Sequence, residues 1–165
     1  MNNKMNYLFE RVCKEYKGAE LGKKATQKIF YFFERQGVEL NLRYGIHYYG
    51  PYSQRLSDYI DELETEGIIT VAEEKRTHVI SWNMDCDYES ELDNSEKRIV
   101  DSVLANLYKK TPVELEALST MDYVKHSILS NKATDNEIVE CFLEIKGKKF
   151  NRKDAFSYLA ELSSL

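Results

Sequence analysis

Residues 53–82 read SQRLSDYIDELETEGIITVAEEKRTHVISW and carry the clearest structural signals of the chain. Ser53 is a favourable helix N-cap, and the apolar residues that follow it have helical spacing: Leu56, Tyr59, Ile60 and Leu63. Gly67 ends this helix, and the apolar runs 68–71 and 77–82 predict two strands separated by the polar turn 72–76. This element order is that of a winged helix, with 53–66 in the place of the recognition helix and the hairpin as the wing.

The residues before Ser53 predict two helices and an irregular segment. Apolar residues recur at helical spacing from Met5 to Tyr16, and Gly18 is a plausible end for this first helix. A second helix is expected over 22–36, with Gly37 as its C-terminal stop and four residues facing inward: Ala25, Ile29, Phe32 and Phe33. Alternation over 38–44 predicts a strand or extended segment, and Gly50-Pro51 predicts a turn over 48–53.

The remaining residues predict a linker and a helical region. Residues 83–96 contain six acids and no base, which is typical of a linker. Beyond them, capping boxes begin helices after Thr111 and Thr134, a short helix is expected over 123–129, and Asn151 caps the last helix. We therefore expect a mainly α (α+β) fold. It has a winged-helix-like N-terminal half (1–82) with a β-hairpin wing, an acidic linker (83–96) and an all-helical C-terminal half (97–165) packed on the first.

Composition excludes several classes of protein. The 165 residues are 42% hydrophobic and contain no apolar run near the roughly 20 residues that span a bilayer. We therefore expect a cytoplasmic protein with no membrane contact. The cysteines at 13, 86 and 141 are odd in number and far apart, so reduced, mostly buried thiols are expected.

The sequence offers no recognisable catalytic or metal-binding pattern. It has no phosphate-binding glycine loop and no nucleophile elbow, and His47, His78 and His126 lack the spacing of zinc ligands. His47 beside two tyrosines could be an acid–base pair, but an aromatic packing turn is the simpler interpretation. We therefore expect a non-enzymatic protein without metal or cofactor, and an unrecognised enzyme remains a third hypothesis.

Charge argues against DNA binding by the helix over 53–66. It carries five acids (58, 61, 62, 64, 66) and one base, Arg55. Because attraction to phosphates supplies most non-specific DNA affinity, such a helix would repel the duplex. Residues 1–35 carry eight bases and four acids, a net charge of +4, and could offset this in part. The predicted topology suits DNA, whereas the charge of this helix does not.

Four segments together resemble a known family. They are ATQKIFYF (25–32), YGPYS (49–53), LETEGII (63–69) and LEALSTMDYV (115–124). The ordered set is similar to the Panacea antitoxin-like domain family and its uncharacterised bacterial and archaeal relatives. There a Gln-Lys-x-x-Tyr helix precedes a Gly-Pro turn and a helix packed beneath a hairpin. The chain has Thr26 where antitoxin members commonly have Leu, and Tyr48-Tyr49 where they have Trp. The resemblance implies a small, non-enzymatic protein that neutralises or delivers a toxin.

Two functional hypotheses follow. The first is a regulator that binds a protein partner, such as a toxin, and the second is a winged-helix transcriptional regulator that binds DNA. For the first, an acidic helix face would suit a basic partner, and an exposed aromatic beside it would serve as an anchor. The expected partner-binding residues are Tyr52, Gln54, Asp58, Asp61 and Glu62. Alternatively, these acids are simply solvated.

Overall fold

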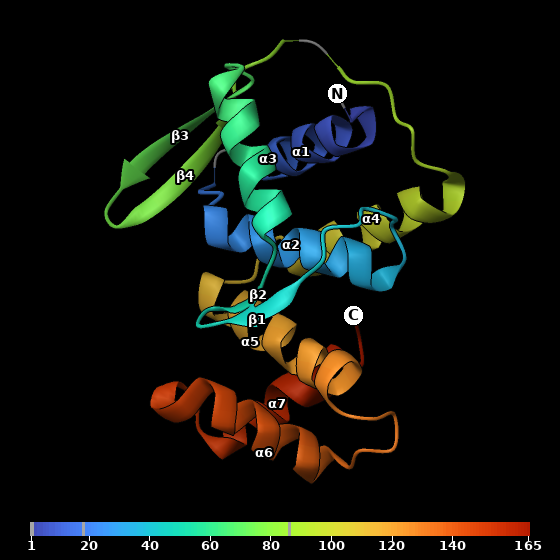
Figure 1. The fold of residues 1–165 in the computed structure, drawn as a ribbon, viewed down its shortest axis with the longest axis vertical. Helices are drawn as coiled ribbons and strands as arrows, with labels where there is room; N and C mark the ends of the chain where they lie inside the picture. Colours follow the sequence, from blue (N-terminus) through green and yellow to red (C-terminus); the bar gives the residue numbers. More distant parts are fainter. Residues whose placement is uncertain (1, 18, 86) are drawn as a thin grey trace.

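The computed structural model describes residues 2–17, 19–85 and 87–165, and this part of the chain is mainly helical with two small antiparallel sheets (Figure 1). The expected class, α+β with a majority of helix, is confirmed. Each sheet has two strands, β1 with β2 and β3 with β4. Gly18 and Cys86 lie outside the described residues, so the expectations placed on them are not addressed. Every helix in the described part is too short or too polar to cross a bilayer.

The N-terminal elements pack around α2 (Lys23–Gln36), which lies in the middle of the molecule (Figure 1). Phe9 of α1 (Asn3–Glu15) contacts the rings of Phe30 in α2 and Tyr59 in α3 (Gln54–Thr65), with centroids 4.7 and 5.6 Å apart. The expected stop at Gly37 is confirmed, because its φ of 121° favours glycine. Ser53 caps α3 as expected by accepting a hydrogen bond from the Leu56 amide.

The hairpin predicted after α3 is present. It pairs β3 (Ile69–Glu74) with β4 (Thr77–Trp82), so the first strand is longer than the run 68–71 indicated. The turn contains only Lys75 and Arg76, both with positive φ, which matches the twist of a two-residue hairpin. β4 also attaches to the segment before α2, since the Ile80 amide donates to the Leu21 carbonyl at 2.8 Å.

The segment between Gly37 and Ser53 differs from the sequence-based expectation. Val38 and Leu42 are buried, as the alternation suggested, but Asn41 and Arg43 adopt positive φ and no strand forms over 38–44. Side chains replace strand partners there: the Leu42 amide donates to Glu34 and its carbonyl accepts from the Ser53 hydroxyl. The Gly-Pro sequence is part of a strand rather than of the turn, because β1 (Gly45–His47) pairs with β2 (Gly50–Tyr52).

The C-terminal elements are helical, as expected. They are α4 (Asn94–Leu107), α5 (Pro112–Tyr123), a π-helical turn (Val124–Ile128), α6 (Asp135–Lys146), a 3₁₀ turn (Gly147–Lys149) and α7 (Arg152–Leu162). The two predicted capping boxes and the Asn151 cap are confirmed. In Figure 1, α5 lies between the N-terminal elements and the pair α6–α7. One hydrophobic cluster contains buried side chains from both halves of the chain.

The acidic segment after β4 lies along α1. The Tyr88 amide donates to Glu10 at 2.8 Å, Asp87 pairs with Lys14, and Leu92 is buried. Asp93 and Glu96 form a capping box, so α4 begins at Asn94 and residues 94–96 of the expected linker belong to this helix. In Figure 1 the other described residues of this segment lie between β4 and α4.

Candidate functional site

The acidic face expected on α3 is exposed. Leu56, Ile60 and Leu63 are buried, and because they occupy one side of the helix, the carboxylates of the other side point to solvent. An open depression of about 360 Å³ is lined by residues of this face: Asp58, Asp61, Glu62, Thr65 and Glu66. Asp61 also pairs with Lys23 of α2 at 3.2 Å.

The structure brings most of the five expected partner-binding residues together. The Gln54 amide donates to Asp58 at 2.8 Å, and the half-buried Tyr52 lies at the start of the same helix, its hydroxyl 3.5 Å from Gln54 Oε1. Asp61 and Glu62 follow one turn further along α3. The Tyr52 ring stacks on His47 with centroids 4.7 Å apart, so it belongs to the edge where α3 meets the β1–β2 hairpin.

Three of the segments that carry the family resemblance meet at one buried junction. The Gln27 side chain binds both backbone groups of Ser53: its amide donates to the carbonyl and its oxygen accepts from the N–H, both at 2.9 Å. The Lys28 ammonium donates to the Pro51 carbonyl at 2.6 Å. A turn further along α2, the Tyr31 hydroxyl donates to Asp122 of α5 at 2.6 Å.

Gly50 completes this junction. A Cβ atom at this position would lie 2.5 Å from the hydroxyl oxygen of Thr120 in α5, and the φ of Gly50 is +92°. Both observations require glycine, because a side chain would clash with α5 and strain the backbone. The helix with Gln-Lys-x-x-Tyr, the Gly-Pro strand and the 115–124 segment therefore form one unit, which we call the α2–hairpin–α5 junction.

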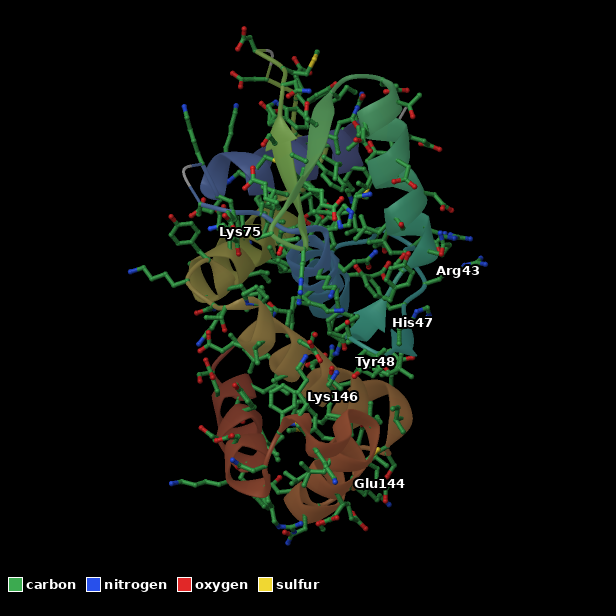
Figure 2. The ribbon with its side chains drawn as sticks, turned by 90° about the vertical axis from the view of Figure 1, so that its left-hand side faces the viewer. Arg43, His47, Tyr48, Lys75, Glu144 and Lys146 are labelled. Atoms are coloured by element: carbon green, nitrogen blue, oxygen red, sulfur yellow. The ribbon has the colours of Figure 1, made fainter. Side chains whose placement is uncertain are left out.

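Lysines and tyrosines gather at the tip of the β1–β2 hairpin. Tyr48 is 80% exposed, and the Tyr49 ring lies beneath the Lys24 ammonium, 3.4 Å from its centroid. The Lys146 ammonium donates to the Tyr48 carbonyl at 2.8 Å. Figure 2 shows His47 and Tyr48 on the hairpin with Lys146 next to them, where the hairpin meets the C-terminal helices.

A single buried carboxylate, Glu116, balances part of this positive charge. It pairs with Lys146 and, at 2.7 Å, with Lys149. Burial alone would raise the pKa of Glu116, but the bonds to the two lysines outweigh burial and lower it. The carboxylate is thus ionised at neutral pH and is already occupied by two cations.

Lys28 has an unusual environment. Its side chain is buried, and within the described part of the chain no carboxylate lies within ion-pair distance of its ammonium. Burial lowers the pKa of Lys28 to about 7, helped by Lys146 and Lys24 and opposed by Glu116. Small changes in its surroundings will therefore change its charge near neutral pH.

The described residues give little support to metal or thiol chemistry. They contain no group of three or more His, Cys, Asp or Glu side chains that could hold a metal ion. Burial raises the pKa of the Cys13 thiol to about 12 and also raises that of Cys141, so neither is an activated nucleophile.

Sequence reasoning missed the lysine cluster and the junction. One signal was available: Lys28 lies one helical turn before Phe32, on the side of α2 expected to face inward. A lysine at such a position is rarely buried without a partner group. The partner itself, the Pro51 carbonyl, is 23 positions away and follows no local pattern.

No family model matches the chain. It is similar to the uncharacterized protein YwgA of Bacillus subtilis (strain 168), with 34% identity over 59 residues. This stretch covers 36% of the chain and 36% of that relative, so the chain spans about a third of the length of the protein it matches.

Proposed function

We propose that this protein is a non-enzymatic regulator that binds a protein partner in the manner of an antitoxin, with the exposed face of α3 as its contact surface. The observation that carries the proposal is the row of exposed carboxylates around an open depression, Asp58, Asp61 and Glu62 among them. A surface of this kind attracts a basic partner and speeds encounter. Tyr52 and Gln54 extend it with an aromatic ring and an amide, which suit the edge of an interface.

The family resemblance supports the antitoxin assignment. The residues that carry it include the α2–hairpin–α5 junction, which fixes the start of α3 through Ser53. The proposal includes a winged-helix-like arrangement of residues 1–82, with the acidic segment 83–96 leading to the helical region 97–165. In this arrangement α3 occupies the position of the recognition helix, and its acidic side chains favour binding to a basic protein over binding to DNA.

A winged-helix transcriptional regulator is the second candidate. The observation that favours it is the turn of the β3–β4 hairpin, where Lys75 and Arg76 are both exposed and would reach DNA phosphates as a wing does. The acidic face of α3 opposes it, because this face would meet the duplex in the usual docking geometry. Protein binding is therefore the better supported function.

The test is charge reversal of the α3 face. Asp58→Lys, Asp61→Lys and Glu62→Lys are combined, and each change at these exposed positions is expected to cost about 0.5 kcal/mol or less. The partner to test first is the product of the neighbouring gene. It is expected to arrest growth when expressed alone and to be harmless with the wild-type protein. The triple variant should fold, bind this product at least about 100-fold more weakly, and fail to protect growth.

A matched control separates the surface from net charge. Glu89→Lys, Glu91→Lys and Glu144→Lys reverse the same number of exposed carboxylates elsewhere in the molecule, and this variant should bind and protect as the wild type does. If the α3 variant protects growth as well as the wild type does, the α3 face is not the contact surface. If the product of the neighbouring gene neither binds the protein nor harms growth, the antitoxin assignment is contradicted. A sequence-specific DNA complex tighter than about 10⁻⁸ M would favour the second candidate.

A further inference from the structure

A hollow of about 360 Å³ lies between α2, the β1–β2 hairpin and α3. Its size falls within the range of pockets that hold small molecules. Its lining includes Lys23, Lys24 and Lys28 from α2 and His47, Tyr49 and Tyr52 from the hairpin segment. We call it the lysine hollow.

The lining of the lysine hollow has positive charge and no carboxylate. This contrasts with the whole chain, whose net charge is −5. Of its three lysines, Lys23 pairs with Asp61. Lys24 lies over the Tyr49 ring, and Lys28 donates to the Pro51 carbonyl. Neither of these two has a carboxylate within ion-pair distance among residues 2–17, 19–85 and 87–165.

Of these two lysines, Lys28 gives the stronger indication of an anion site. An ammonium group has three N–H donors, and the described part of the chain supplies one acceptor, the Pro51 carbonyl. The residue is only 4% exposed, so the remaining donors gain little from bulk water. Buried charges are ordinarily paired, and a bound anion would supply the missing partner.

Rings line the same hollow. His47 and Tyr52 are stacked with an interplanar angle of 25°, and Tyr49 is held under Lys24. Aromatic rings that line a hollow offer faces on which a planar ring can stack. The lining thus combines cationic groups for an anion with flat faces for a ring.

We propose that the lysine hollow binds a small molecule that joins a phosphate group to a flat heteroaromatic ring, of about the size of a nucleoside monophosphate. Lys24 and Lys28 hold the phosphate, and the hairpin rings contact the heterocycle. This site goes beyond the proposed partner surface and does not depend on it.

Another large hollow in the described residues lacks this character. It measures about 500 Å³ and lies between α1 and β4, but Lys14 and Lys17 are matched there by Asp85 and Asp87. Its charges already balance, and Lys14 pairs directly with Asp87. The lysine hollow is therefore the better site for an anion.

Calorimetric titration tests the proposal with three probes: AMP, adenosine without the phosphate, and inorganic phosphate without the ring. We expect AMP to bind with a Kd below about 1 mM and at least about tenfold more tightly than either fragment. At about pH 8, binding should be accompanied by proton uptake, because an anion beside Lys28 raises its pKa from about 7. The uptake is measured from the dependence of the heat on the ionisation enthalpy of the buffer.

Variants locate the binding. Lys24 is exposed, so Lys24→Met should fold and weaken AMP binding at least about tenfold, whereas Lys97→Met, an equal change at an exposed position of α4, should leave it unchanged. His47→Leu should weaken the binding of AMP and leave the binding of inorganic phosphate unchanged. Lys28→Met should weaken the binding of AMP and abolish the proton uptake that accompanies it.

Three results would overturn the proposal. They are no binding of AMP up to about 5 mM, equal binding of AMP by the Lys24→Met and wild-type proteins, and binding of an oligonucleotide without binding of AMP. If Lys28→Met does not fold, the Lys24→Met and His47→Leu titrations still test whether AMP binds in the lysine hollow. None of these variants changes Asp58, Asp61 or Glu62, so the result is separate from the test of the partner surface.

Discussion

The two hairpins of this protein differ in what holds them. The β3–β4 hairpin pairs six residues from each strand, and its turn end, Lys75 and Arg76, is exposed. The β1–β2 hairpin pairs only three residues from each strand, yet α2 bonds to its backbone and α5 packs against Gly50. The longer hairpin contributes Ile69 and Ile80 to the hydrophobic core, whereas the shorter one is anchored through its backbone by α2 and α5. Anchoring therefore depends on side chains from neighbouring helices rather than on strand length.

This difference has a consequence for function. A hairpin anchored through buried backbone groups keeps its position, so Tyr49 and Tyr52 line the lysine hollow in a fixed geometry. The first residue after the hairpin, Ser53, also caps α3. The same contacts therefore position both the hollow and the acidic helix face.

The largest expected effect is that of Gly50→Ala. The new Cβ would lie 2.5 Å from Thr120 Oγ1 on a backbone with positive φ, so unfolding free energy should fall by about 3 kcal/mol. Gly67→Ala is the matched control, because Gly67 has a φ of +74° and open space around it; it should cost only about 1 kcal/mol. Denaturant titration measures both, and adding Thr120→Ala should recover part of the Gly50→Ala loss. Equal losses at the two glycines would contradict the close contact with α5.

Gln27→Leu should have the next largest effect. It leaves the buried Ser53 N–H without its acceptor and removes one donor from the Ser53 carbonyl, for a cost of about 2 kcal/mol. Gln54→Leu, the same change at an exposed position, should alter stability by about 0.5 kcal/mol or less. Thermal and denaturant unfolding compare the two variants. A loss at Gln27 no larger than at Gln54 would show that this clamp does not hold the hairpin.

A smaller effect, when taken per pH unit, is expected from the titration of Lys28. Its pKa is about 7 in the folded protein, below the ordinary value of 10.5, so between these values the unfolded state binds more protons and stability rises with pH. We expect the stability of the wild type relative to Lys28→Met to increase between about pH 7 and 9, by at most about 1.4 kcal/mol per pH unit, and to be flat below about pH 6. Unfolding curves across this range measure the difference. A difference independent of pH would indicate that Lys28 is solvated.

Local signals in the sequence predicted most helices well. Ser53, Thr111, Thr134 and Asn151 cap helices as expected, because a cap acts within three residues of itself. The β1–β2 hairpin was missed, since 38–44 alternates like a strand while the true strands are set by contacts with α2 and α5. Four of the five expected partner-binding residues lie on the exposed side of α3, with the half-buried Tyr52 at its start, and their role remains a prediction.

Native-state hydrogen exchange of the Ser53 amide tests the central claim, that the α2–hairpin–α5 junction is part of the core. This amide is buried and donates to Gln27. The reference amides are those of Glu74 and Thr77, which face each other next to the turn of the β3–β4 hairpin. We predict that Ser53 exchanges only through global unfolding, with a free energy equal to that from denaturant titration, whereas Glu74 and Thr77 exchange through local opening. Exchange of Ser53 as fast as that of Glu74 and Thr77 would contradict the account.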